Sequence, residues 1–208
     1  EDLYFTWLCG VPRGHSKGSI TVKGEKKEVQ GAGYHDHQWG NAFPEASWNH
    51  WIWTRQNLED YTIVVFDLVA NKKYGYKRYP LVFAQDKHGE VVFDNFDASN
   101  VKLEILGEYS EEESGKKYPS KFKYTFSKGG KTLEYTVNAK QKLEVNSVRP
   151  LGNGVKKATR GMMGLQPSYV SFEGVGDLAL SEAGQTKRQS GNLIYEFMYN
   201  AKSYKEHI

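Results

Sequence analysis

The chain has little cysteine, no long apolar run and no block of like charge, and each shortage excludes a class of protein. Its single cysteine, Cys9, excludes a framework of intrachain disulfides. No run of about 18 apolar residues occurs, so the sequence contains no candidate membrane-spanning helix. Lys and Arg (28) nearly balance Asp and Glu (25) and are interspersed with them. We therefore expect no nucleic-acid partner, since such partners favour a basic arm or patch.

A targeting signal is also missing from the first residues. Residues 1–4 have neither the basic segment nor the apolar segment of a secretory signal peptide, which leaves the localisation open. Because the chain begins without Met, we expect a processed protein or a piece of a longer one.

Aromatic residues, in contrast, are abundant. They make up 14% of the chain, with 5 Trp, 14 Tyr and 10 Phe. Such side chains favour strands and offer wide apolar faces to a ligand. With 208 residues the chain is long enough to bury a sizeable core, and we expect one domain over residues 1–208.

Alternation of apolar and polar residues recurs along the chain and predicts strands rather than helices. The predicted hairpins and strands cover residues 18–40, 47–70, 79–96, 100–109, 120–146, 167–180 and 189–200. Residues 110–119 are predicted to form a charged loop, and the glycine-rich residues 149–166 a long loop or lid. Many short strands linked by hairpins predict an all-β fold, an antiparallel barrel or sandwich.

One run, GAGYHDHQWGNAF (residues 31–43), concentrates histidine, aspartate and tryptophan between glycines. Alternate residues of a strand share a face, so His35, His37 and Trp39 point one way. Tyr34 and Asp36 point the other way. The glycines would allow a bulge that re-aims some of these side chains.

Three functions fit this motif. His-x-His suits two ligands of a metal ion, with His50 or Asp67 as a third, although no Cys pair or Glu completes the set. Alternatively, Asp36 hydrogen-bonds nearby backbone and the histidines fill the core. In the third interpretation the imidazoles transfer protons beside Trp39, whose ring stabilises a developing cation. We favour the third interpretation, and expect no metal and no other cofactor.

The next strand supports proton transfer in an aromatic site, because four of the five Trp lie within residues 39–53. Alternation divides the side chains of residues 47–57 between two faces of the strand, and we expect the first of these faces to line a substrate. The first carries Trp51, Trp53 and Arg55, and the second carries Trp48, His50 and Ile52.

Two acidic residues stand in apolar strands. Asp67 shares a face with Val65 and Val69, which predicts a buried carboxyl that is either functional or paired with a cation such as Arg55. Glu196 lies on the face opposite Tyr195 in the last strand. Tyr195 and Glu196 are both candidates for lining a ligand, and Glu196 could equally form an ion pair at the rim of the site.

The motifs also resemble a known family. Pro12-Arg13-Gly14, the block Gly33–Gly40 and the closing run 191–200 are similar to the carotenoid 1,2-hydratase superfamily of lipocalin-like proteins. That superfamily includes kievitone hydratase and fungal Diels–Alderases. The resemblance implies a lipocalin-like (calycin) β-barrel equivalent to the C-terminal domain of a two-domain protein, and so an N-terminal companion domain or chain.

The resemblance further implies chemistry on a hydrophobic polyene, isoprenoid or polyketide. It assigns function to His37 and Trp39, and to a Tyr-x-Asp pair whose counterpart is Val65-Phe66-Asp67, where Val65 replaces the tyrosine. Hydration of a C=C bond would then use Asp67 as the acid and His37 as the base. Asp36 would orient His37, and Trp39 and the tryptophans of the next strand would stabilise the cation. The alternatives are a pericyclase of the Diels–Alderase type and a non-catalytic protein that binds apolar ligands.

Overall fold

The computed structural model describes residues 2–112, 114–146, 167–200 and 204. The chain folds into two compact units, Glu1–Phe43 and Pro44–Ile208. The predicted loop or lid at residues 149–166 lies outside the described residues. None of the helices in the described part of the chain is long and apolar enough to span a membrane.

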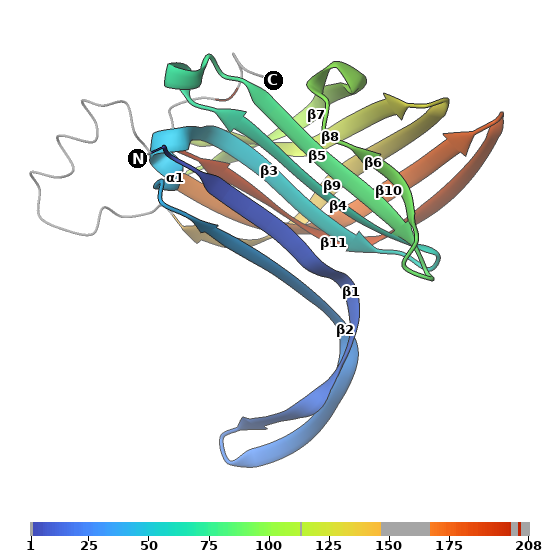
Figure 1. The fold of residues 1–208 in the computed structure, drawn as a ribbon. Coiled ribbons are helices and arrows are strands. Elements are labelled where there is room, and N and C mark those ends of the chain that lie inside the picture. The colour runs from blue at the N-terminus through green and yellow to red at the C-terminus, as the bar shows by residue number, and fades with distance from the viewer. Residues whose placement is uncertain (1, 113, 147–166, 201–203, 205–208) are drawn as a thin grey trace, which may run out of the picture. The chain divides into compact units, whose positions relative to one another are not determined.

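The first unit is a two-stranded antiparallel ribbon of β1 (Phe5–Val22) and β2 (Glu25–Gly40) (Figure 1). The hairpin predicted within residues 18–40 is confirmed. Its two-residue turn, Lys23 and Gly24, has φ values of 51° and 86°, the left-handed conformation that matches the twist of a tight hairpin. At the base of the ribbon Asn41 receives a hydrogen bond from the Tyr4 amide to its Oδ1 (2.9 Å).

The second unit is a single nine-stranded antiparallel sheet (Figure 1). Its strands follow in the spatial order β6-β5-β4-β3-β11-β10-β9-β8-β7. The elements in chain order are α1 (Pro44–Ser47), β3 (Trp48–Asn57), β4 (Tyr61–Ala70), the 3₁₀ turn Lys72–Tyr74, β5 (Arg78–Asp86), β6 (Val91–Asn95), the 3₁₀ turn Ala98–Asn100, β7 (Val101–Glu111), β8 (Lys116–Lys128), β9 (Lys131–Asn146), β10 (Ser168–Glu182) and β11 (Gln185–Tyr199). The predicted all-β, antiparallel, lipocalin-like fold is confirmed.

The predicted loop at residues 110–119 is mostly strand. β7 continues to Glu111 and β8 begins at Lys116, so Pro119 lies inside a strand and opposite Glu108. Register shifts of β7 at Gly107 adjoin this position. A proline is accommodated there because bulges interrupt the regular ladder of hydrogen bonds.

The sheet curls until side chains near its two edges meet. The rings of Phe93 on β6 and Phe126 on β8 lie 6.5 Å apart, and Lys128 pairs with Asp94 at 2.9 Å. Aromatic rings fill the interior, each at most 2% exposed: Tyr118, Phe122, Tyr124, Phe126, Tyr135, Phe172, Tyr195, Phe197 and Tyr199. The interior is therefore a packed core in which ring contacts hold the curl.

The register assigns each residue of β3 and β4 to the inner or the outer face, because directly opposed residues share a face. Ile52 opposes Asp67, and both face the interior. A register shift between Trp48 and His50 corrects one prediction. Trp48 lies on the outer face, with its ring 5.8 Å from that of Tyr79, instead of sharing a face with His50.

Candidate functional site

The motif of residues 31–43 covers the C-terminal half of β2 and the three residues after it, and its alternation is as predicted. His35, His37 and Trp39 lie on one face of the ribbon and are exposed, Trp39 by 43%. The rings of His37 and Trp39 lie 5.2 Å apart and are tilted by 30°. Two apolar residues of β1, Leu8 and Val11, oppose the two histidines.

Leu8 and Val11 are themselves 55% and 40% exposed. The exposed strip formed by these two residues with His35, His37 and Trp39 thus combines two imidazoles with apolar surface. An imidazole can donate or accept a proton near neutral pH, and an indole face attracts positive charge.

Asp36 lies on the opposite face of the ribbon, where two hydrogen bonds fix its side chain. Its Oδ2 accepts hydrogen bonds from the Trp7 indole Nε1 (2.9 Å) and from the Tyr34 hydroxyl (3.0 Å). Burial raises the pKa of Tyr34, and the neighbouring Cys9 and Asp36 add to the shift, so the phenol stays a hydrogen-bond donor.

The predicted contact by which Asp36 would orient His37 is therefore wrong. It required a bulge at the glycines of β2, but both register shifts insert their extra residues in β1, between Cys9 and Gly14. Asp36 and Tyr34 thus keep the face opposite His37. Asp36 fixes β2 against β1 and in this way supports the strand that carries the exposed strip.

Asp67 is buried as predicted, at 3% exposure, and its partners come from the barrel interior. Arg78 donates from Nε to Oδ1 (2.9 Å) and from a terminal nitrogen to Oδ2 (2.6 Å), while the Tyr124 hydroxyl donates to Oδ2 (2.8 Å). Both carboxylate oxygens are thus occupied by charge-assisted hydrogen bonds. The predicted pairing of Asp67 with Arg55 is wrong, since Arg55 lies on the other face of the sheet.

The negative charge of Asp67 shifts the pKa of its two partners, Arg78 and Tyr124. Burial by itself lowers the pKa of Arg78, but the hydrogen bonds and the charge of Asp67 outweigh burial and raise that pKa above its ordinary value. Burial raises the pKa of Tyr124 well above its ordinary value, and the carboxylate of Asp67 raises it further. These shifts keep Arg78 charged and Tyr124 protonated, as the observed hydrogen bonds require.

The structure separates the predicted aromatic wall from Asp67. Trp51, Trp53 and Arg55 are half-buried on the outer face, and Trp51 packs edge-on against Phe66 at 6.4 Å. The proposed combination of Asp67 with these tryptophans is therefore not assembled, because the sheet itself lies between them.

The side chains of the last strand, β11, also alternate between the outer face and the interior of the sheet. Glu196 opposes Trp53 and so shares the outer face. Tyr195 opposes Thr54 in the interior, where it is fully buried and donates a hydrogen bond to the Pro119 carbonyl (2.9 Å). Burial raises the pKa of Tyr195.

The candidate metal ligands do not converge in the described residues. His50 stacks on Phe197 at 5.6 Å, and its Nδ1 lies 2.8 Å from Asn49 Oδ1. Asp67 is held by Arg78. Across the described part of the chain, no group of three or more His, Cys, Asp or Glu is arranged to hold a metal ion.

Arg78 and Tyr124 contact Asp67 although neither is predicted as a site residue from the sequence. Arg78 opposes Val69, two residues along β4 from Asp67, so a hairpin register would have suggested it. Tyr124 lies 57 residues from Asp67 in the chain, and only the curl of the sheet brings the two together.

Comparison with known proteins agrees with this fold. The sequence matches the AttH-like family over residues 6–149, more than half of the chain. The chain belongs to the AttH-like family. Over 94 residues it is 31% identical to the quinolone epoxide rearrangement protein penF of Penicillium thymicola, a match that covers 44% of this chain and 24% of penF.

Two solved structures of other proteins have a fold similar to that of this AttH-like chain. CghA with bound Sch210972 superposes with a TM-score of 0.65 at 10% identity, over 95% of this chain and 55% of that one. Kievitone hydratase from Nectria haematococca superposes with a TM-score of 0.56 at 17% identity, over 96% of this chain and 53% of that one. The AttH-like chain therefore spans about half the length of CghA and kievitone hydratase, and its match to penF covers about a quarter of penF. The resemblance inferred from the motifs is confirmed at the level of the superfamily.

Proposed function

We propose that this AttH-like chain takes part in acid–base chemistry on a hydrophobic natural product, a polyene, isoprenoid or polyketide, at the exposed strip of the ribbon. His37 transfers the proton and Trp39 stabilises positive charge that develops on the substrate. One observation carries the proposal: His37 and Trp39 are exposed and lie 5.2 Å apart, whereas the other candidate acid is sealed in the core.

Hydration of a C=C bond fits this assignment if His37, in place of Asp67, donates a proton to one alkene carbon and its neutral imidazole then accepts the proton that water loses on adding to the cation. Both oxygens of Asp67 already accept hydrogen bonds, so that residue supports the fold instead. The names of the relatives are consistent with acid–base steps, since one is a hydratase and another a protein of epoxide rearrangement. His35, Leu8 and Val11 would contact the apolar substrate beside the reacting group.

The proposal is tested with lycopene and farnesol as probes in H₂¹⁸O, with mass spectrometry of the products. Incorporation of ¹⁸O reports hydration. His37→Ala should lower kcat/KM by about 10²–10⁴-fold, the usual contribution of a general acid–base group. Trp39→Phe should lower it less, because a phenyl ring retains part of the cation attraction.

His15→Ala is the matched control, since His15 is an exposed histidine of the same ribbon outside the motif. Unchanged turnover in both His37→Ala and Trp39→Phe would refute the proposal. Quenching of Trp fluorescence by the probes without any product would indicate a binding protein.

A pericyclase is the second candidate. The burial and hydrogen bonding of Asp67 favour a pericyclase, because holding a polyene in a folded conformation needs no dedicated acid. The product would then be an isomer of the substrate without ¹⁸O, and His37→Ala would lower the rate only a few-fold. Filling the apolar surface, for instance with Val11→Trp, would abolish the reaction.

We also propose that the substrate site is completed by an N-terminal companion domain or chain. The support is that the chain covers only 55% of CghA and 53% of kievitone hydratase. Coexpression with such a companion should raise probe affinity, and equal affinity with and without it would contradict this part of the proposal.

A further inference from the structure

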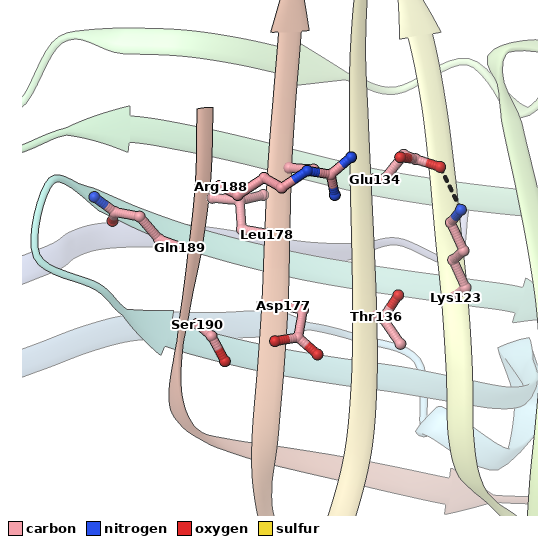
Figure 2. A pocket seen from close by; sticks show the side chains of 9 residues that line it. Lys123, Glu134, Thr136, Asp177, Leu178, Arg188, Gln189 and Ser190 are labelled. Atoms are coloured by element: carbon pink, nitrogen blue, oxygen red, sulfur yellow. Dashed lines mark hydrogen bonds and ion pairs between the residues drawn. The ribbon is translucent and has the colours of Figure 1, made fainter. Parts of the chain in front are cut away.

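A polar groove of about 400 Å³ lies on the outer face of strands β8–β11, away from the ribbon motif in the sequence. The register aligns two rows of side chains across these strands. The first row runs Lys123, Thr136, Asp177, Ser190, and the second runs Glu134, Ala179, Arg188. Figure 2 shows Thr136, Asp177 and Ser190 side by side on neighbouring strands.

Ala179 accounts for the hollow. It stands between two long side chains, Glu134 and Arg188, in the second row, and its small methyl group leaves room above β10 that the Arg188 side chain crosses (Figure 2). Ala179 is only 4% exposed, so it forms the floor beneath the neighbouring side chains. A small residue flanked by long ones on a sheet face produces a depression with charged walls.

Only some of the charged side chains in the groove form ion pairs. Lys123 pairs with Glu134, as the dashed line in Figure 2 shows. Asp177 and Arg188 form no ion pair with any residue of the described chain, and Figure 2 shows the Arg188 side chain extending across β10 toward Glu134. One carboxylate and one guanidinium are therefore available on the same groove.

We propose that this groove binds a small zwitterion that carries an ammonium and a carboxylate on a short chain, as an amino acid does. Asp177 receives the ammonium, and the hydroxyls of Thr136 and Ser190 beside it supply further acceptors for its N–H groups. Arg188 receives the carboxylate through its fork of N–H donors. This site is independent of the function proposed for the ribbon.

The spacing selects the length of the ligand. Neighbouring strands lie about 4.8 Å apart, so the two hydroxyls flank the Asp177 carboxylate within reach of one ammonium. Arg188 stands two residues along β11 from Ser190, a rise of about 6.6 Å. An ω-amino acid with three methylene groups has a length comparable to this backbone separation, and Arg188 is an exposed side chain that can turn toward its carboxylate, whereas a ligand with one charge contacts only one of the two charged groups.

The test uses three probes of equal chain length: γ-aminobutyrate, n-butylamine and butyrate. They are titrated into the ¹⁵N-labelled 208-residue chain, and amide shifts are followed by NMR. The expected result is that γ-aminobutyrate shifts the amides around Thr136, Asp177 and Arg188, with at least about 10-fold tighter binding than either probe of single charge. Tenfold corresponds to about 1.4 kcal/mol, a modest gain for a second charged contact.

Two variants and two controls complete the experiment. Asp177→Asn should abolish the preference for γ-aminobutyrate over butyrate, and Arg188→Gln should abolish its preference over n-butylamine. The controls remove the same charges nearby: Glu182→Gln on β10 and Lys187→Gln, whose side chain points to the other face of β11. Equal binding of all three probes, shifts elsewhere only, or identical behaviour of the groove variants and the controls would overturn the proposal.

Discussion

Replacing Arg78 by methionine should destabilise the protein strongly, because it leaves the Asp67 carboxylate buried without its cation. The side chains are only 17% and 4% exposed, so water cannot replace the lost contacts. Removing one partner of such a buried pair costs about 3–5 kcal/mol. Tyr124→Phe, which removes one hydrogen bond to the same carboxylate, should cost about 1.5–3 kcal/mol.

A double variant separates an ion-pair effect from lost packing. In Asp67→Leu combined with Arg78→Met no unpaired charge remains, so the double variant should be more stable than Arg78→Met alone. The assay is urea unfolding followed by Trp fluorescence, with the free energy of unfolding taken by linear extrapolation.

The control breaks an exposed pair of the same sheet. Lys128→Met removes the partner of Asp94, where the side chains are 48% and 43% exposed, and should change the free energy of unfolding by less than about 1 kcal/mol. A loss below about 1 kcal/mol in Arg78→Met, or a double variant less stable than the single one, would refute the structural role given to Asp67.

Three further predictions concern the ribbon, a buried amine and a glycine. Asp36→Ala removes the acceptor of two hydrogen bonds and should speed amide exchange in β1 and β2 but not in the sheet, whereas Gln38→Ala, an exposed change on the same strand, should not. Burial lowers the pKa of Lys116 from 10.5 to about 8, so the unfolded chain binds more protons between these pH values. The free energy of unfolding should therefore rise by about 2 kcal/mol between about pH 7.5 and about pH 9.5, and Lys116→Met should flatten this rise. A Cβ on Gly176 would lie 2.5 Å from a glutamine oxygen and 2.6 Å from a leucine methyl, so Gly176→Ala should cost about 1–3 kcal/mol in urea unfolding. Gly18→Ala, where no atom lies within 4 Å, should leave stability nearly unchanged.

Several features of the fold and the site follow from local sequence alone. Alternation with period 2 predicted the strands and the division of His37 and Trp39 from Asp36, because neighbouring side chains of a strand point to opposite faces. The same rule predicted Asp67 as a buried carboxyl between valines. The hairpin predicted within residues 120–146 turns at Gly129 and Gly130, whose φ values are 59° and 76°.

Other features depend on contacts between residues far apart in the chain. One register shift turned Trp48 to the outer face, and the curl of the sheet brought Tyr124 to Asp67. Neither is encoded in a short stretch of sequence, because a bulge and a curl are set by how whole strands pack.

The sequence by itself thus determined most of the strands and most of the side chains that share a face within them, since both are local properties of the chain. It did not predict the strand before residue 18 or the strand residues within 110–119. Tertiary structure decided which faces meet. It sealed Asp67 with Arg78 in an aromatic core, separated it from Trp51 and Trp53 by the thickness of a sheet, and left His37 and Trp39 exposed. The physical reason is that partners for buried charge and apolar rings are found only when distant strands pack together.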